Sequence, residues 1–177
     1  LRDPMKPLRL LVLLALAAGS CARPVPEPRF LNLDPESSAG ALGTGWSGFE
    51  KTDRGDTFAW AQAREAEVTL VAPGSADRLV RFRAWPFEWP GAPPQTASVS
   101  VNGTTFATVT LAPGPAVYGA VAPAAAWREG ANTLKFEFAW AEAPKDRVPG
   151  ADDSRTLAAA FDWIEVVPVR TEGSRQP

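Results

Sequence analysis

The residues best suited to hold a ligand lie in the segment 78–103, which reads RLVRFRAWPFEWPGAPPQTASVSVNG. Trp85 and Trp89 lie there among prolines, and the polar side chains near them are those of Arg83, Glu88 and Gln95. An indole ring offers an apolar face to the C–H face of a sugar, while carboxylate, amide and guanidinium groups bind sugar hydroxyls. The segment is therefore a candidate carbohydrate site. The alternative is a lid that folds over an open end of a sheet with its tryptophans directed inward.

Four further residues complete the set of candidate ligand-binding residues. Trp46 and Glu50 belong to the Gly-rich segment GTGWSGFE, and Asp153 and Arg155 lie in a polar segment near the C-terminus. We expect Trp46, Trp85 and Trp89 to lie in loops. Three other tryptophans lie in segments with strand-like alternation, which favours packing between sheets, and they are Trp60, Trp140 and Trp163.

Loop carboxylates permit a second kind of chemistry. A glycoside hydrolase uses two carboxyl groups about 5 to 10 Å apart across the sugar. The candidate acids are Glu50, Asp53, Asp56, Glu88, Asp152 and Asp153. No spacing in the sequence pairs any two of them, so solvated loop acids and turn caps remain the alternative. Asp153 and Arg155 could equally form a structural ion pair.

The composition excludes several mechanisms. The sequence has no histidine and one cysteine, so nucleophilic mechanisms that need a histidine base and histidine-based zinc sites lack their residues. No phosphate-binding glycine motif follows a strand. The formal net charge is −2, which gives no basic surplus for nucleic acid. We expect no catalysis, no metal site and no cofactor.

Short alternating segments separated by proline and glycine indicate an all-β domain. The segment 80–84 alternates Val80, Phe82 and Ala84 with two arginines, and Asn102-Gly103 is a strong hairpin signal because both residues tolerate positive φ. We predict a long loop over 34–48, a helical turn near 123–127 and a polar loop over 141–154. The predicted strands cover 30–33, 57–62, 67–71, 80–84, 97–101, 105–111, 117–121, 134–140 and 157–167. This pattern of about eight antiparallel strands predicts a β-sandwich or jelly roll.

The N-terminal residues resemble an export signal. Met5 is the expected start, and a basic region followed by the apolar run 10–18 is typical of a secretory signal peptide over residues 1–20. A Pro-rich tether would then occupy 21–29, the β-sandwich domain 30–169 and a disordered polar tail 170–177. The segment AGSC, which ends at Cys21, resembles a bacterial lipobox, although Ala18 stands where leucine is usual. The alternative is ordinary cleavage nearby, which would leave Cys21 as a free thiol.

The lipobox resemblance implies lipidation of Cys21 and attachment to the cell envelope. The thioether-linked lipid of that family gives stable anchoring through more than one acyl chain. Because Ala22 rather than aspartate follows the cysteine, the resemblance implies the outer membrane rather than the inner membrane.

Two segments resemble the galactose-binding-like jelly roll that accompanies many glycoside hydrolases. VSVNG ends at Gly103, and the pattern Gly130-x-Asn132-x-Leu134 begins 27 residues later. Asn132 can cap the bend through its side chain. A looser resemblance covers most of the mature chain. It rests on GWSGFE, the alternating arginine strand with its Pro-aromatic loop, Gln95 before VSVNG, and Asp153-x-Arg155-x-Leu157. These segments are similar to β-sandwich domains attached to bacterial membrane glycosyltransferases. The resemblance implies the fold, and it makes a structural calcium ion conceivable.

Three functions follow from these observations. The first is a non-catalytic envelope lipoprotein whose galactose-binding-like β-sandwich contacts a glycan or polysaccharide. The second is a structural module that docks onto another envelope protein. The third is a carboxylate-based glycan hydrolase.

Overall fold

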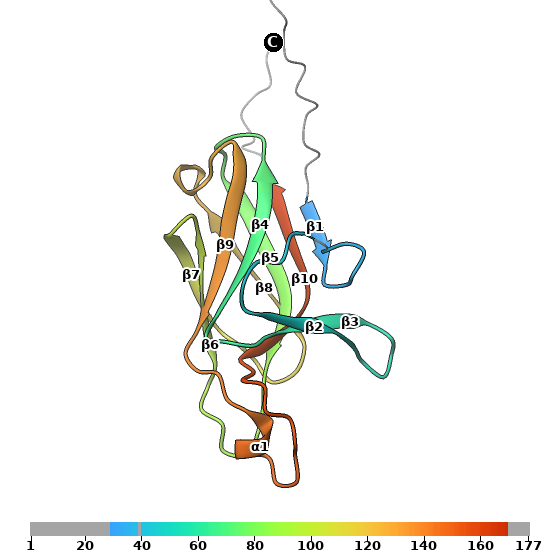
Figure 1. Ribbon diagram of the computed structural model, residues 1–177. Coiled ribbons are helices and arrows are strands. Elements are labelled where there is room, and N and C mark those ends of the chain that lie inside the picture. Colours follow the sequence, from blue (N-terminus) through green and yellow to red (C-terminus); the bar gives the residue numbers. More distant parts are fainter. Residues whose placement is uncertain (1–28, 39, 170–177) are drawn as a thin grey trace, which may run out of the picture.

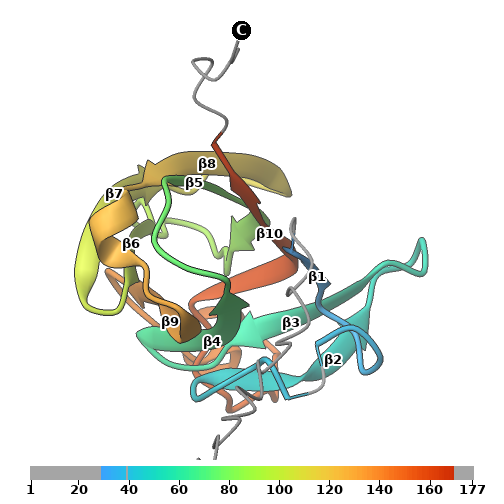
Figure 2. The same ribbon diagram turned by 90° about the horizontal axis from the view of Figure 1, so that it is seen from above.

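Figure 1 shows the computed structural model, which describes residues 29–38 and 40–169. Two antiparallel sheets face each other across one hydrophobic core, as the view from above makes clear (Figure 2). Sheet A contains, in spatial order, β2 (Trp46–Lys51), β3 (Thr57–Ala61), β10 (Ala159–Pro168), β5 (Arg78–Pro86) and β8 (Ala116–Ala122), and β1 (Arg29–Asn32) pairs with β10. Sheet B contains β4 (Glu65–Ala72), β9 (Gly130–Phe138), β6 (Thr96–Val101) and β7 (Thr104–Thr110). The predicted β-sandwich is confirmed, with ten strands in the described residues.

Alternation along the strands builds the core. In β5 the side chains of Val80, Phe82 and Ala84 are buried between the sheets, while the residues between them face outward. The rings of Phe82, Phe136 and Phe161 contact one another, with centroids 4.8 to 5.6 Å apart. Burial of one such side chain stabilises the fold by about 1.5–3 kcal/mol, so these three rings contribute strongly to holding the sheets together.

Two asparagines fix the end of the sandwich that carried the family resemblance. Asn102 and Gly103 have φ angles of 49° and 83°, as a two-residue hairpin turn requires. The buried Asn132 amide donates to the carbonyls of Arg128 and Gly130 and accepts from the backbone N–H of Arg128 and from Asn102. Asn132 therefore caps the bend before β9, as the sequence predicted.

Three short elements differ from the sequence prediction. The segment expected as a loop up to Gly48 contains the start of β2, an edge strand with a register shift between Trp46 and Phe49. β5 continues to Pro86 and includes Trp85. Near the C-terminal loop the chain forms α1 (Pro144–Arg147), and η1 (Ala124–Ala126) occupies the predicted helical turn. Trp46 and Trp85 are therefore strand residues, and the prediction that they lie in loops was wrong.

The predicted signal peptide, Cys21, most of the tether and the polar tail lie outside the described residues. Among the residues that are described, no helix is long and apolar enough to cross a membrane. β1 begins where β10 ends, because Arg29 pairs with Val166, so both strands meet at one end of the sandwich (Figure 1).

Candidate functional site

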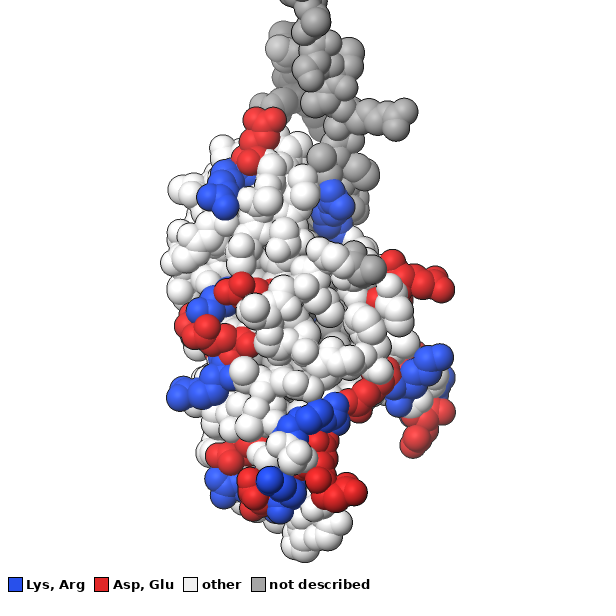
Figure 3. All heavy atoms as spheres, in the orientation of Figure 1, with Lys and Arg blue, Asp and Glu red and all other residues white. Residues whose placement is uncertain are grey.

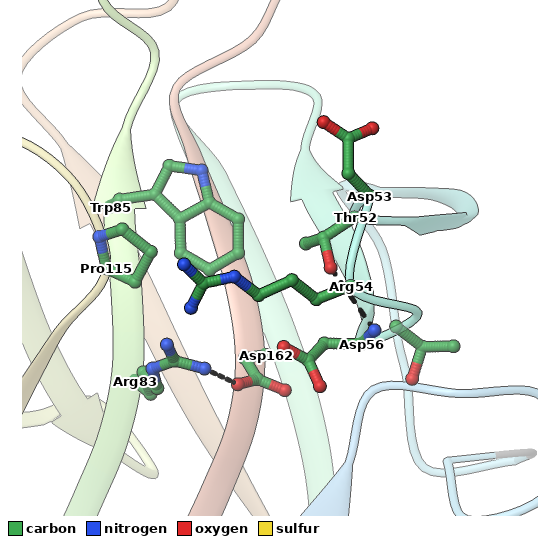
Figure 4. Close-up of a pocket in the computed structure, with 9 residues that line it drawn as sticks. Thr52, Asp53, Arg54, Asp56, Arg83, Trp85, Pro115 and Asp162 are labelled. Atoms are coloured by element: carbon green, nitrogen blue, oxygen red, sulfur yellow. Dashed lines mark hydrogen bonds and ion pairs between the residues drawn. The ribbon is translucent and has the colours of Figure 1, made fainter.

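A pocket of about 400 Å³ opens on the outer face of sheet A, and we call it the sheet A groove. Its floor comes from β5 and β10, and the β2–β3 hairpin, which projects sideways from the sandwich, forms one wall (Figure 1). Figure 4 shows the residues that line it: Thr52, Asp53, Arg54, Asp56, Thr57, Arg83, Trp85, Pro115 and Asp162. This volume lies in the range typical of small-ligand sites.

An irregularity in β10 positions the acid on the groove floor. The register between β10 and β5 shifts between Phe161 and Trp163, which is the signature of a bulge. Phe161 and Ile164 point into the core, so the two residues between them, Asp162 and Trp163, both lie on the outer side. The bulge therefore places Asp162 and Trp163 on the same face of the sheet. Regular alternation would place these two successive side chains on opposite faces.

An ion pair joins Arg83 and Asp162 across the floor (Figure 4). The Asp162 side chain is 11% exposed and the Arg83 side chain 34% exposed, so the pair is sheltered but reachable from the groove. A paired guanidinium and carboxylate retain free hydrogen-bonding positions for a ligand, and each holds the other in place.

Trp85 supplies the apolar surface of the groove. It lies half-buried on the outer face, and its ring centroid is 5.4 Å from that of Phe58 on β3. In the strand register Ala160 lies between Trp60 on β3 and Trp85 on β5. Because the alanine is small and fully buried, the larger rings can close over it. The indole is therefore supported on one side and available to solvent on the other.

The hairpin tip adds polar side chains to the opposite wall. Thr52 closes the turn, since its N–H donates to the Asp56 carbonyl and its hydroxyl accepts from the Asp56 N–H. Asp53, Arg54 and Asp56 make no ion pair within the described part of the chain. Figure 4 shows the Arg54 side chain extending from the turn toward Trp85 and Arg83. The groove thus combines an indole face with guanidinium and carboxylate groups, the combination that suits a polyhydroxylated ligand.

Of the predicted ligand-binding residues, the groove brings together Arg83 and Trp85. Glu88 and Gln95 line a second, largely apolar pocket of about 470 Å³, with Trp140 and four prolines. Gln95 is buried, and its amide donates to the carbonyls of Trp140 and Ala158 at 2.8 and 3.2 Å. Its side chain is committed to joining two segments of the fold, so the prediction that Gln95 contacts a ligand gains no support.

Trp89 belongs to a different part of the surface from Trp85. Its ring packs edge-on against Trp140, with centroids 4.7 Å apart, and at a tilt against Phe87, with centroids 5.3 Å apart. The Arg147 guanidinium lies over the Trp89 ring. Phe87 is buried and Trp89 half-buried. The segment after β5 therefore folds against the end of the sandwich as the lid alternative described, while Trp85 faces the groove.

The other predicted site residues have structural contacts. Arg155 forms ion pairs with Glu50 at 2.6 Å and with Asp153 at 2.7 Å, which joins the C-terminal loop to β2. Hydrogen bonds from Arg155 lower the pKa of Asp153, and the two carboxylates raise the pKa of Arg155. The structural ion pair is thus confirmed. The Trp46 indole donates to the Glu67 carbonyl at 2.7 Å and packs against Phe161.

The molecular surface carries charges of both signs. On the face drawn in Figure 3, acidic and basic side chains mix along the sides and the lower end.

Sequence reasoning missed Asp162 and misplaced three tryptophans, Trp60, Trp140 and Trp163, which were expected to pack between the sheets. Trp60 and Trp163 lie half-buried on the outer face of sheet A. Trp140 lies beyond the end of β9, where it packs against Trp89. In β3 the small residues Ala59 and Ala61 face the core instead. The alternation itself was recognised in the sequence, but alternation is compatible with either face being buried. The larger residues were assigned to the core, and this choice was wrong.

The described residues show no acidic cluster for the calcium ion that the family resemblance made conceivable. In residues 29–38 and 40–169, no three acidic, cysteine or histidine side chains are grouped so that they could hold a metal ion.

Comparison with known proteins establishes the fold. No family model matches the sequence, and a search of curated proteins finds no match. Among solved structures, a ruminal family GH26 endo-β-1,4-mannanase matches with a TM-score of 0.52 and 15% identity over 84% of this chain and 27% of its own. BtGH115A, a 4-O-methyl-α-glucuronidase with specificity for decorated arabinogalactans, matches with a TM-score of 0.50 and 11% identity over 80% of this chain and 17% of its own.

A third match covers nearly the whole of a smaller structure. The C-terminal CBM6 of LamC, a laminarinase from Zobellia galactanivorans, is 9% identical over 79% of this chain and 98% of its own, with a TM-score of 0.49. The two matches with TM-scores of 0.50 and 0.52 share the β-sandwich fold that the sequence predicted. This chain spans about a quarter or less of the two matched enzymes.

Proposed function

We propose that this protein is a non-catalytic carbohydrate-binding module, held at the cell envelope by a lipid on Cys21, and that the sheet A groove holds the glycan. A fold of this kind hosts binding, structural and catalytic roles, so the fold alone does not decide among them. The observation that carries the proposal is one pocket that joins the exposed side of Trp85 to the Arg83–Asp162 ion pair.

In the groove, an aromatic ring and a pair of charged side chains would bind different parts of the sugar. Trp85 would take the apolar face of a sugar ring, and its support by Phe58 keeps the indole fixed before the ligand arrives. Arg83 and Asp162 would exchange hydrogen bonds with ring hydroxyls. Because each already holds the other, little side-chain freedom is lost on binding. This role needs no bond to be broken, and so it requires no pair of free catalytic carboxylates.

Calorimetric titration of the soluble domain tests the proposal. Among the described residues, the hydrophobic core extends from Leu31 to Val166, so a chain that starts at Ala22 contains every described core residue. The ligands are mannan, laminarin, xylan and cellulose oligosaccharides, a panel that includes the polymer cut by the matched mannanase. We expect at least one to bind, and Trp85→Ala to weaken that binding about tenfold or more, since a stacked aromatic ring contributes about 1–3 kcal/mol in comparable base stacking.

Trp89→Ala is the matched control, because it removes the same side chain from the lid segment outside the groove. Its affinity should stay close to that of the unaltered protein. Equal losses in the two variants, or no binding to any member of the panel, would contradict the proposal.

The lipid anchor has a separate test. The unaltered full-length protein, expressed in a bacterium with two membranes, should partition into the detergent phase and incorporate labelled palmitate. Cys21→Ser should do neither. Labelling of the Cys21→Ser protein would rule out this residue as the site of lipidation.

The docking role remains a second candidate because of the second pocket. Its walls of Phe87, Trp140 and prolines are largely apolar, as a protein contact would need. Chemical crosslinking in intact cells should then join a partner near Glu88. A single uncrosslinked species would count against this role without affecting the groove.

A further inference from the structure

A second aromatic surface lies on the outer face of sheet A, beyond the groove. It consists of Trp163 on β10 and Phe30 on β1. Their ring centroids are 5.6 Å apart and the ring planes differ by 32°, so the two rings form one tilted surface. Phe30 is 58% exposed, the largest exposure among the large hydrophobic residues in the described part of the chain. This apolar surface therefore faces solvent.

The strand register places this surface directly beside the groove. Trp163 pairs with Arg83, which lies two residues from Trp85 on β5. With about 3.3 Å per residue along a strand and about 4.8 Å between strands, the backbones of Trp85 and Trp163 lie about 8 Å apart. Asp162, on the groove floor, directly precedes Trp163. The two aromatic surfaces therefore flank the Arg83–Asp162 pair.

The groove wall continues past the same point. Asn32 pairs with Trp163, and its amide donates to the hydroxyl of Thr57, which lines the groove. This hydrogen bond of 3.4 Å connects the hairpin to β1. The wall that borders Trp85 thus extends alongside Trp163.

A second ion pair lies one step further along the strands. Arg81 and Glu165 are paired across β5 and β10, and their side chains are 46% and 17% exposed. Arg81 lies against Gly119 on β8, where a Cβ atom would come within 3.2 Å of the Arg81 side chain. The absence of a side chain there lets Arg81 lie flat on the sheet. The face thus alternates between aromatic rings and ion pairs: Trp85, Arg83–Asp162, Trp163–Phe30 and Arg81–Glu165.

We propose that these four features form one continuous track that binds an internal stretch of an uncharged linear glycan, several sugar units long. The inference rests on the proposed function of the groove. Two aromatic surfaces separated by an ion pair exceed the reach of one sugar ring, so the track matches a chain. Each arginine of the floor is paired with a carboxylate, which leaves the floor without the net positive charge that an anionic polymer would need.

Titration with ligands of increasing length tests the track. The protein from Ala22 onward is titrated with cello-, manno-, laminari- and xylo-oligosaccharides, each from disaccharide to hexasaccharide, and with polygalacturonate as the anionic polymer. For the series that binds, affinity should rise at least tenfold from disaccharide to hexasaccharide, and polygalacturonate should bind more weakly than the hexasaccharide.

Variants at the second aromatic surface then test whether this surface causes the rise in affinity with oligosaccharide length. Trp163→Ala should weaken hexasaccharide binding about tenfold and Phe30→Ala about threefold, while disaccharide binding stays unchanged. Val121→Ala is the control on the same face, because Val121 is 48% exposed and lies on β8, which contributes no side chain to the track. If Trp163→Ala does not fold, as judged by circular dichroism, Phe30→Ala decides, since its ring is mostly exposed already.

The two proposals fail in different ways. An affinity that does not change with length, equal hexasaccharide binding by the Phe30→Ala and Val121→Ala proteins, or preference for polygalacturonate would overturn the track. If Trp85→Ala still weakens binding in that case, the groove stands as a single-sugar site. Loss of every binding signal in the unaltered protein would instead overturn the proposed function itself.

Discussion

The ion pair on the groove floor makes a quantitative prediction about stability. Arg83 and Asp162 differ in solvent exposure, with side chains 34% and 11% exposed. Removal of one partner leaves the other unpaired, and the cost grows with the burial of the group that remains. Arg83→Met should therefore cost more than Asp162→Asn, because it strands the more buried charge.

The expected magnitudes follow from the two exposures. A fully buried stranded charge costs about 3–5 kcal/mol and an exposed pair contributes about 0–1 kcal/mol, so Arg83→Met should lower the free energy of unfolding by about 3 kcal/mol. Asp162→Asn keeps an oxygen that accepts from Arg83, and its cost should be about 1 kcal/mol. The double variant should show a coupling energy of about 2 kcal/mol, because it strands no charge.

Urea unfolding followed by tryptophan fluorescence measures these differences. For a domain of this size, about 3 kcal/mol corresponds to a decrease in Tm of about 6 to 12 °C, which thermal unfolding can check independently. The reasoning would be refuted by a larger cost for Asp162→Asn than for Arg83→Met, or by a coupling energy below about 0.5 kcal/mol.

Three further predictions concern stability. Gly45→Ala should cost about 3 kcal/mol or more in urea unfolding, because φ is +87° and a Cβ would lie 2.0 Å from the Glu65 carbonyl oxygen. Asn132→Ala should cost about 3 kcal/mol, because it leaves buried backbone groups unpaired. Stability should fall as the pH drops through about 4, since Arg155 holds the pKa of Asp153 below its ordinary value and the unfolded chain binds that proton first; Asp153→Asn should flatten this decline.

Each of these has a control and a contradicting result. Gly55→Ala has φ of +89° but open space around the Cβ position, so it should cost only about 1 kcal/mol; an equal cost at Gly45 would mean that the close approach is unimportant. Ser98→Ala, whose hydroxyl contacts only the exposed Thr108, should change little beside Asn132→Ala. If the Asp153→Asn protein and the unaltered protein lose stability equally as the pH falls, other carboxylates cause that loss.

The fold could be predicted because its signals are local. Alternation gives strands whatever their partners are, and the Asn102-Gly103 turn and the Gly130-x-Asn132 bend each depend on a few adjacent residues. The start of β2 was missed because Gly43, Gly45 and Gly48 made the segment resemble a loop. Its pairing with β3 overrides that weak local preference.

The candidate site could be predicted only in part, because it depends on long-range register. Arg83 and Trp85 were identified from their types and spacing. Their partner Asp162 is 79 residues from Arg83, and only the register between β5 and β10 brings the two side chains together. Likewise, the side of the sheet on which Trp163 lies is set by which face meets sheet B. Alternation within one strand cannot decide that.

The tryptophan indole N–H signals in an NMR titration test the central claim most directly, because the seven tryptophans include residues in the groove, in the track, in the lid segment and in the core. When the best-binding hexasaccharide is added, the signals of Trp85 and Trp163 should shift in proportion to saturation. Those of the lid residue Trp89 and of the buried Trp127 should stay in place. Shifts confined to Trp89 and Trp140, with Trp85 unchanged, would place binding in the second pocket and contradict the assignment of the groove as the glycan site.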